Sequence, residues 1–182
     1  MQVRPTDIPE VKILEPKVFS DDRGWLCETW SQERYARAGI PHTFVQSNHS
    51  HSVAGVVRGM HYQLGDGQAK LVWVVRGRIL DVALDLRTGS PTFGRWTSTE
   101  LSSENRLQMY IPAGFAHGFM ALEDCDVLYL MSDRYRPSLE RGICWRDPAL
   151  ALPWPGDHAT LSEKDRQLPL LANVNARNLP AV

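Results

Sequence analysis

The chain has 182 residues, a formal net charge of -1 and a hydrophobic share of 43%. This length suits one domain with one sizeable core, and the near-neutral charge excludes a generally basic nucleic-acid-binding protein. The sequence shows no secretory signal, no apolar run long enough for a membrane span, and no CxxC pair among its three cysteines. We therefore expect a single-domain cytoplasmic protein with reduced thiols that binds neither nucleic acid nor membrane.

Short runs of Val, Leu, Ile and aromatic residues, separated by Gly, Pro, Asp and Ser, predict strands along most of the chain. One polar-faced segment after Ser31, a candidate N-cap, predicts a short helix. In chain order we expect a strand at 11–19, the helix at 33–38, and strands at 44–50, 56–63, 71–76, 79–86, 95–101, 108–111, 118–122 and 127–132.

Glycine-containing segments predict the turns between these strands. Arg76-Gly77-Arg78 predicts a tight hairpin, and residues 89–91 predict a longer turn. From Pro137 onward prolines are frequent, and residues 161–166 predict a helical turn or two that starts near Thr160 or Ser162. Many short strands with few helices favour an all-β jelly roll, a sandwich or barrel whose interior can hold a small ligand. We expect residues 1–182 to form this one domain, with 137–182 as a C-terminal extension that contributes short helices.

The strand at 56–63 carries polar side chains inside a strand-like run. A single histidine such as His61 is more often a hydrogen-bonded structural residue than a base. Lys70 at the start of the next strand and Tyr129 in an apolar run shift the balance, because together the three supply a base, a cation and a weak acid. Strict alternation places Arg58 and His61 on opposite faces, unless Gly59 marks a β-bulge.

The remaining histidines raise the question of a metal. A metal-binding jelly roll of the cupin type has HxH followed by Glu, and a later His in a PxGxxH stretch. His117 fits the later stretch, but His61 is followed by Tyr62 and Gln63, and His49-Ser50-His51 has no suitably placed Glu. We therefore expect no metal, and interpret His49 and His51 as a polar sheet face.

Ordered segments along nearly the whole chain, from about residue 13 to about 170, resemble the dTDP-4-dehydrorhamnose 3,5-epimerases, which are cupin-type jelly rolls. So many segments in order are far more specific than any one motif. The landmarks are Asp22-Arg23-Gly24 with Glu28, and the runs 44–50, 58–63, 68–72, 89–94, 101–105, 111–119 and 147–149.

The resemblance implies a homodimer without metal or organic cofactor that inverts carbons 3 and 5 of dTDP-4-keto-6-deoxy-D-glucose to give dTDP-4-keto-L-rhamnose. It implies that His61 accepts the proton, that Asp165 pairs with His61, and that Tyr129 donates. Lys70 is our candidate for stabilising the enolate, because a hydrogen next to a ketone is too weakly acidic for an unaided base. The resemblance places further substrate contacts at Arg23, Glu28, Gln46, Ser47, Asn48, Arg58, His117, Tyr135 as the thymine-stacking aromatic, Glu140 and Lys164.

The chain departs from the family pattern at a few positions. Residues 67–70 read Gly-Gln-Ala-Lys instead of Ala-Gln-Gly-Lys, Trp73 stands where a basic residue is frequent, and Ser47 where an acidic one is common. Three alternatives stay open. They are an epimerase that inverts only carbon 3 or only carbon 5 of a dTDP-4-keto-deoxysugar, a metal-dependent cupin enzyme, and a non-catalytic nucleotide-sugar binding module.

Overall fold

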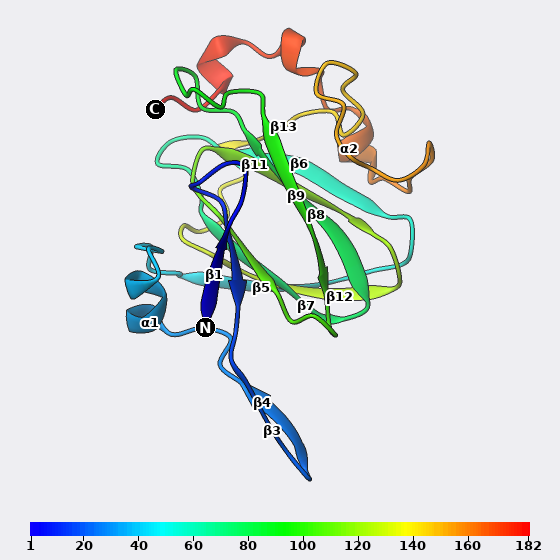
Figure 1. The fold of residues 1–182 in the computed structure, drawn as a ribbon. Helices are drawn as coiled ribbons and strands as arrows, with labels where there is room; N and C mark the ends of the chain where they lie inside the picture. Colours follow the sequence, from blue (N-terminus) through cyan, green and yellow to red (C-terminus); the bar gives the residue numbers. More distant parts are fainter.

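The computed structural model describes residues 1–182 and consists mainly of two antiparallel sheets that face each other (Figure 1). This arrangement confirms the predicted all-β fold. The six-stranded sheet has the order β1 (Gln2–Pro5), β2 (Lys12–Glu15), β10 (Gln108–Ile111), β7 (Lys70–Arg76), β12 (Cys125–Met131) and β5 (Gln46–Ser52). The five-stranded sheet has the order β13 (Glu140–Gly142), β6 (Val57–Gln63), β11 (Phe115–Ala121), β8 (Arg78–Asp85) and β9 (Trp96–Ser102).

Both predicted helices are present and short. Ser31 occupies the N-cap of α1 (Gln32–Arg37), although its side chain makes no capping hydrogen bond. Ser162 caps α2 (Glu163–Arg166) by accepting a hydrogen bond from the backbone N–H of Asp165, which satisfies one free donor of the first turn. After α2 come only two 3-10 turns, Leu171–Asn173 and Ala176–Asn178, and this C-terminal segment runs along one end of the sandwich (Figure 1).

None of the helices has the length and apolar character that a membrane crossing requires.

The space between the sheets is apolar in one part and polar in another. Side chains on one face of a strand alternate with those on the other, so the inner face of β7 carries Lys70 followed by Val72 and Val74. On β12, which runs antiparallel to β7, the inner face is apolar first, at Val127, and polar later, at Tyr129. The apolar positions join one buried core cluster, and the polar positions lie beyond it and leave room for a ligand.

Three local predictions differ from the structure. The strand expected at 11–19 ends at Glu15, and the chain enters a separate two-stranded sheet from Val18 onward. The turn at 76–78 is not a hairpin, because β7 and β8 belong to different sheets, and the chain passes there from one sheet to the other. Gly77 has φ +73°, and a Cβ on it would lie 2.2 Å from the carbonyl oxygen of Asp124, so this corner requires glycine. The strand expected from residue 118 already begins at Phe115, which places His117 inside β11. The turn at 89–91 does connect two paired strands, β8 and β9.

A two-stranded hairpin extends away from the sandwich. Strands β3 (Val18–Asp21) and β4 (Gly24–Cys27) pair only with each other and project from the body at the lower end of Figure 1. Their residues Phe19, Trp25 and Leu26 are 53%, 57% and 72% exposed. An isolated hairpin that exposes three large apolar side chains lacks a covering surface within its own chain.

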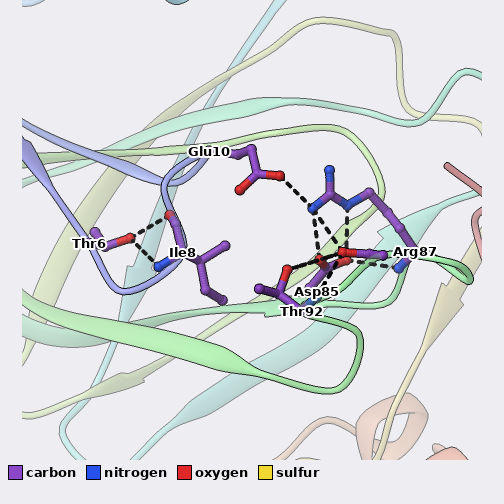
Figure 2. Close-up of polar contacts among 7 residues, drawn as sticks. Thr6, Ile8, Glu10, Asp85, Arg87 and Thr92 are labelled. Atoms are coloured by element: carbon purple, nitrogen blue, oxygen red, sulfur yellow. Dashed lines mark hydrogen bonds and ion pairs between the residues drawn. The ribbon is translucent and has the colours of Figure 1, made fainter.

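A buried carboxylate anchors the loop after β8. Asp85 accepts hydrogen bonds from Arg87 Nε at 2.9 Å, Ser90 Oγ at 2.6 Å and Thr92 Oγ1 at 2.6 Å. Figure 2 shows the Arg87 guanidinium between Asp85 and Glu10, with which it also pairs at 3.1 Å. The cluster therefore ties the β8–β9 loop to the segment between β1 and β2.

Candidate active site

A β-bulge in β6 places two polar side chains on the inner face of its sheet. His61 pairs with His117 of β11, and Arg58 pairs with Phe119. Between these two pairs β6 has one more residue than β11, so the register shifts and the alternation of β6 is offset. Arg58 and His61 consequently face the same side, and both line the same cavity. The β-bulge at Gly59, which the sequence left as an alternative to strict alternation, is therefore present.

Glycines permit the close approach of the two strands at this point. Gly59 has φ +117°, and a Cβ on it would lie 2.6 Å from the Cα of Gly118. A Cβ on Gly118 would lie 2.7 Å from the sulfur of Met60 and 2.8 Å from the carbonyl oxygen of Arg58. All three distances are shorter than a carbon side chain tolerates, so the bulge depends on both glycines.

Two adjoining cavities, of about 460 and 300 Å³, open between the sheets. His61, Lys70 and Tyr129 line both of them, His61 from the five-stranded sheet and the other two from the six-stranded sheet. Together the cavities have the size of a typical small-molecule site. The larger is lined by further polar residues that include Arg58, His117, Ser162, Lys164 and Asp165, and the smaller by Gln46, Asn48, Gln63, Gln68, Tyr135 and Glu140.

His61 is held by a buried carboxylate from α2. Its Nε2 lies 2.6 Å from Asp165 Oδ1, and the Asp165 side chain is only 4% exposed. Burial tends to raise the pKa of Asp165, but bonds to His61, to the Gly59 N–H and to Ser162 outweigh it and lower this pKa. An ionised carboxylate only accepts hydrogen bonds, so Nε2 of His61 carries the proton and Nδ1 is left as the basic atom.

A second histidine–carboxylate pair lies beside Lys70. His117 Nε2 contacts Asp81 Oδ1 at 2.6 Å, and both residues are buried. Burial lowers the pKa of His117 and outweighs the opposing effect of Asp81, so His117 is neutral at pH 7. Burial also lowers the pKa of Lys70 to about 8, against the raising effects of Asp81 and Glu140. Lys70 is thus a cation that is poorly solvated and close to losing its proton.

Tyr129 belongs to a short series of hydrogen bonds with strand β5. Asn48 Nδ2 donates to the Tyr129 hydroxyl oxygen at 3.2 Å, and Gln46 Nε2 donates to Asn48 Oδ1 at 3.1 Å. The backbone N–H of Tyr135 donates to Gln46 Oε1 at 2.9 Å. Gln46 and Asn48 face inward because they alternate along β5, and Ser47 between them is exposed on the outer face.

At the edge of the cavities an ion pair joins two parts of the chain. The Tyr135 hydroxyl donates to Glu140, and the same carboxylate oxygen pairs with Lys164 of α2. Burial tends to raise the pKa of Glu140, but Lys164 and Tyr135 lower it overall. The hydrogen bond to Glu140 raises the pKa of Tyr135, whose ring is half exposed. An exposed aromatic beside a cavity is available for stacking on a planar ligand group.

Three of the predicted site residues do not reach the cavities. Arg23 lies on the projecting β3–β4 hairpin, where its side chain is 89% exposed and pairs with Asp21. Glu28 pairs with Arg34 at 3.3 Å outside both cavities. The side chain of Ser47 points outward. Trp73 also packs on the outer face of its sheet, so this departure from the family pattern, like that at Ser47, leaves the interior unchanged.

The histidines considered as metal ligands do not converge. His49 and His51 contact Asp126 at 3.4 and 3.2 Å on the outer face of the six-stranded sheet, whereas His117 is buried inside. No group of three His, Cys, Asp or Glu side chains is arranged to hold a metal ion.

Sequence reasoning missed several residues that line the interior. Gln63 is two positions after His61 on β6, and Phe119 is two positions after His117 on β11, so alternation from the predicted histidines indicates both. Asp81 lines neither cavity but holds His117 from the neighbouring strand, and its place in an otherwise apolar strand, where a carboxylate needs a partner, indicated such a supporting role.

A jelly roll with this polar interior defines a cupin-type protein whose site suits proton transfer to and from a bound small molecule. The sequence profile described as dTDP-4-dehydrorhamnose 3,5-epimerase matches residues 5–173. The chain belongs to this family, as its motifs indicated.

Relatives and solved structures agree with this result. The dTDP-4-dehydrorhamnose 3,5-epimerase of Pseudomonas aeruginosa is 52% identical over 163 residues, which cover 88% of this chain and 90% of that protein. A Legionella pneumophila structure, the epimerase RmlC in complex with dTDP-4-keto-L-rhamnose, matches with a TM-score of 0.96 and 46% identity, covering 100% and 98% of the two chains. ChmJ, a 3'-monoepimerase from Streptomyces bikiniensis in complex with dTDP-quinovose, matches with a TM-score of 0.89 and 37% identity, covering 97% and 92%.

Proposed function

We propose that this protein inverts carbons 3 and 5 of dTDP-4-keto-6-deoxy-D-glucose without a cofactor. The observation that carries the proposal is that His61 and Tyr129 line the same two cavities from opposite sheets. A base and an acid on opposite sides of a bound sugar can remove a proton from one face of a carbon and return one to the other. Family membership supports the choice of substrate.

In the proposed reaction, His61 Nδ1 takes the proton from the carbon next to the ketone. The electron pair of that C–H bond forms a C=C bond, and the ketone oxygen becomes an enolate oxygen. Lys70 stabilises this negative charge as it develops, and Asp165 stabilises the imidazolium. Tyr129 then gives its hydroxyl proton to the opposite face of the carbon, the C=O bond re-forms, and solvent restores both side chains.

Solvent deuterium tests the number of carbons inverted. The protein is incubated with dTDP-4-keto-6-deoxy-D-glucose in deuterium oxide, and the label is located by NMR. We expect deuterium at carbons 3 and 5, each with inverted configuration. Label at one carbon alone would contradict the proposal and favour a single-carbon epimerase, the activity stated for ChmJ. His61→Ala is expected to bind the substrate and to exchange no proton, whereas a binding module would give no exchange before or after the change.

Metal analysis separates this reaction from that of a metal-dependent cupin enzyme. We expect that the purified protein keeps its rate after treatment with a chelator, because His61, Lys70 and Tyr129 supply the base, the cation and the acid. A stoichiometric metal whose removal abolishes activity would contradict the mechanism.

We further propose that the protein acts as a homodimer. The exposed Phe19, Trp25 and Leu26 need a covering surface, and the same hairpin carries Arg23 away from the cavities of its own chain. A second copy that covers the hairpin would bury these side chains and bring Arg23 close to a cavity of that copy. Light scattering is expected to give twice the chain mass, and Trp25→Asp to reduce it. A monomer with full activity would contradict this arrangement.

A further inference from the structure

The hydrogen bonds between β5 and Tyr129 have only one consistent direction. A backbone N–H can only donate, so the N–H of Tyr135 fixes Oε1 of Gln46 as the acceptor and turns Nε2 of Gln46 toward Asn48. Asn48 must then present Oδ1 to Gln46, which turns its Nδ2 toward the Tyr129 hydroxyl. The orientation of both amides therefore follows from one backbone donor.

This direction determines what the Tyr129 hydroxyl can do. Asn48 donates to its oxygen, so the hydroxyl proton is not used in that bond. This bond is the only hydrogen bond that the hydroxyl makes within the chain, and Tyr129 lines both cavities. The proton is therefore free to point into the cavities, and the donor from Asn48 is in place to stabilise the phenolate that remains after proton transfer.

We propose that Gln46 is a positioning residue that, through Asn48, keeps the Tyr129 hydroxyl proton directed at the bound sugar. The inference rests on the proposed function, because it concerns the step in which Tyr129 protonates the enolate carbon. In that step the Tyr129 O–H bond breaks, the C–H bond forms on the face opposite His61, and the enolate electrons re-form the C=O bond. Gln46 takes no part in bond making, and acts by excluding the orientation in which Tyr129 donates to Asn48.

Gln46→Glu reverses the series with almost no change in shape. One carboxylate oxygen of the new side chain accepts the Tyr135 N–H, and the other oxygen, also an acceptor, faces Asn48. The Asn48 amide must then turn its Nδ2 toward residue 46, which leaves Oδ1 facing Tyr129. The hydroxyl donates to that oxygen, and its proton is withdrawn from the sugar. Asn48→Asp produces the same reversal directly, because an aspartate cannot donate to Tyr129.

The measurement is how the enolate partitions in deuterium oxide. Where Tyr129 does not protonate the enolate, His61 first exchanges its acquired proton for solvent deuterium and then returns the deuteron to the original face. The substrate is then recovered with label and unchanged configuration. The ratio of labelled, recovered substrate to labelled, inverted product therefore reports the Tyr129 step. Weaker binding affects both products equally and leaves the ratio unchanged. We expect Gln46→Glu and Asn48→Asp to raise this ratio about tenfold or more, since a positioned general acid contributes at least that much.

The matched control is Gln2→Glu, which makes the same change of charge at an exposed strand position with no side-chain hydrogen bond. It is expected to leave the ratio unchanged, and Tyr129→Phe is expected to set the upper limit. If Gln46→Glu raises KM alone, or lowers exchange and inversion in parallel, Gln46 merely contacts the substrate and the inference is overturned. If Gln46→Glu does not fold, Asn48→Asp decides by the same criteria. Absence of label with the unaltered protein would instead overturn the proposed function, and the inference with it.

Discussion

His61 and His117 lie directly opposite each other in the register of β6 and β11, yet each is bonded to a different carboxylate. Asp165 reaches His61 from α2, and Asp81 reaches His117 from the neighbouring strand β8. Because the partners come from separate elements, either pair can be altered without removing the other. The His61 pair can therefore be tested by itself.

Asp165→Asn is expected to lower kcat by about two to four orders of magnitude, because an amide neither fixes the Nε2–H tautomer nor stabilises the imidazolium. The dissociation constant for dTDP, measured by calorimetry, should stay close to its original value. Asp157→Asn, at a surface position paired with Arg146, serves as the control. Equal kcat values for the Asp165 variant and the unaltered protein would show that the carboxylate has no part in proton transfer.

The pH dependence of kcat/KM is expected to reflect Lys70. Burial lowers the pKa of Lys70 to about 8, and a lysine is a cation only below its pKa. Stabilisation of the enolate should therefore be complete at pH 7 and decline as the pH rises through about 8. The Lys70→Arg variant should show no such decline, even if its rate is low, because arginine keeps its charge throughout this pH range. A decline that begins only near the pKa of an ordinary lysine would contradict the role.

Asp85→Asn is expected to destabilise the fold by about 2 kcal/mol at neutral pH, the value of a pKa lowered from 3.8 to about 2. Because the folded-state pKa is the lower one, this stability is present above the unfolded-state pKa of 3.8 and is lost as the pH falls through about 2. Urea unfolding at a series of pH values measures it. The variant should lose less stability than the unaltered protein on acidification, and Asp66→Asn, at an exposed position, should behave like the unaltered protein.

Gly118→Ala is expected to cost about 1–3 kcal/mol of stability, because the new Cβ would collide with Met60 and Arg58 at the bulge. Epimerase activity should fall further than stability alone explains, since Arg58 and His61 would shift. Gly94→Ala is the comparison, because Gly94 has φ +75° but open space around it, and so reports backbone strain without collision. Similar activities of the two variants would mean that the bulge does not position the site.

Periodicity predicted most of the strands, because their alternating side chains pack on one face and the signal is local. It failed where the determining contact is distant. The segment around Gly77 resembles a hairpin turn, but the chain passes there from one sheet to the other, with the distant Asp124 carbonyl packed against Gly77. The pairing of Asp165 with His61, 104 positions earlier, came only from the family resemblance, because no local pattern encodes it.

The same limit applies to substrate contacts. Side chains alternate along β5, so Gln46 and Asn48 face the interior as expected. The same motif also includes Ser47, which this alternation places on the outer face. Arg23 and Glu28 belong to the motif set without reaching the cavities of their own chain. A list of motif residues therefore does not distinguish the side chains that line the cavities from those that lie outside them.

The additional residue in β6 also governs how this segment can change. Before the bulge, the even-numbered residue Arg58 faces inward. After the bulge, the odd-numbered residues His61 and Gln63 face inward. Met60 and Tyr62 belong to the apolar packing behind the sheet. Deleting Gly59 or Met60 would remove the additional residue and leave Arg58 and His61 two positions apart, so regular alternation would keep both on the inner face. A gap of one residue between residues 58 and 61 is therefore compatible with this interior, whereas the same gap at Tyr62 would turn Gln63 to the outer face.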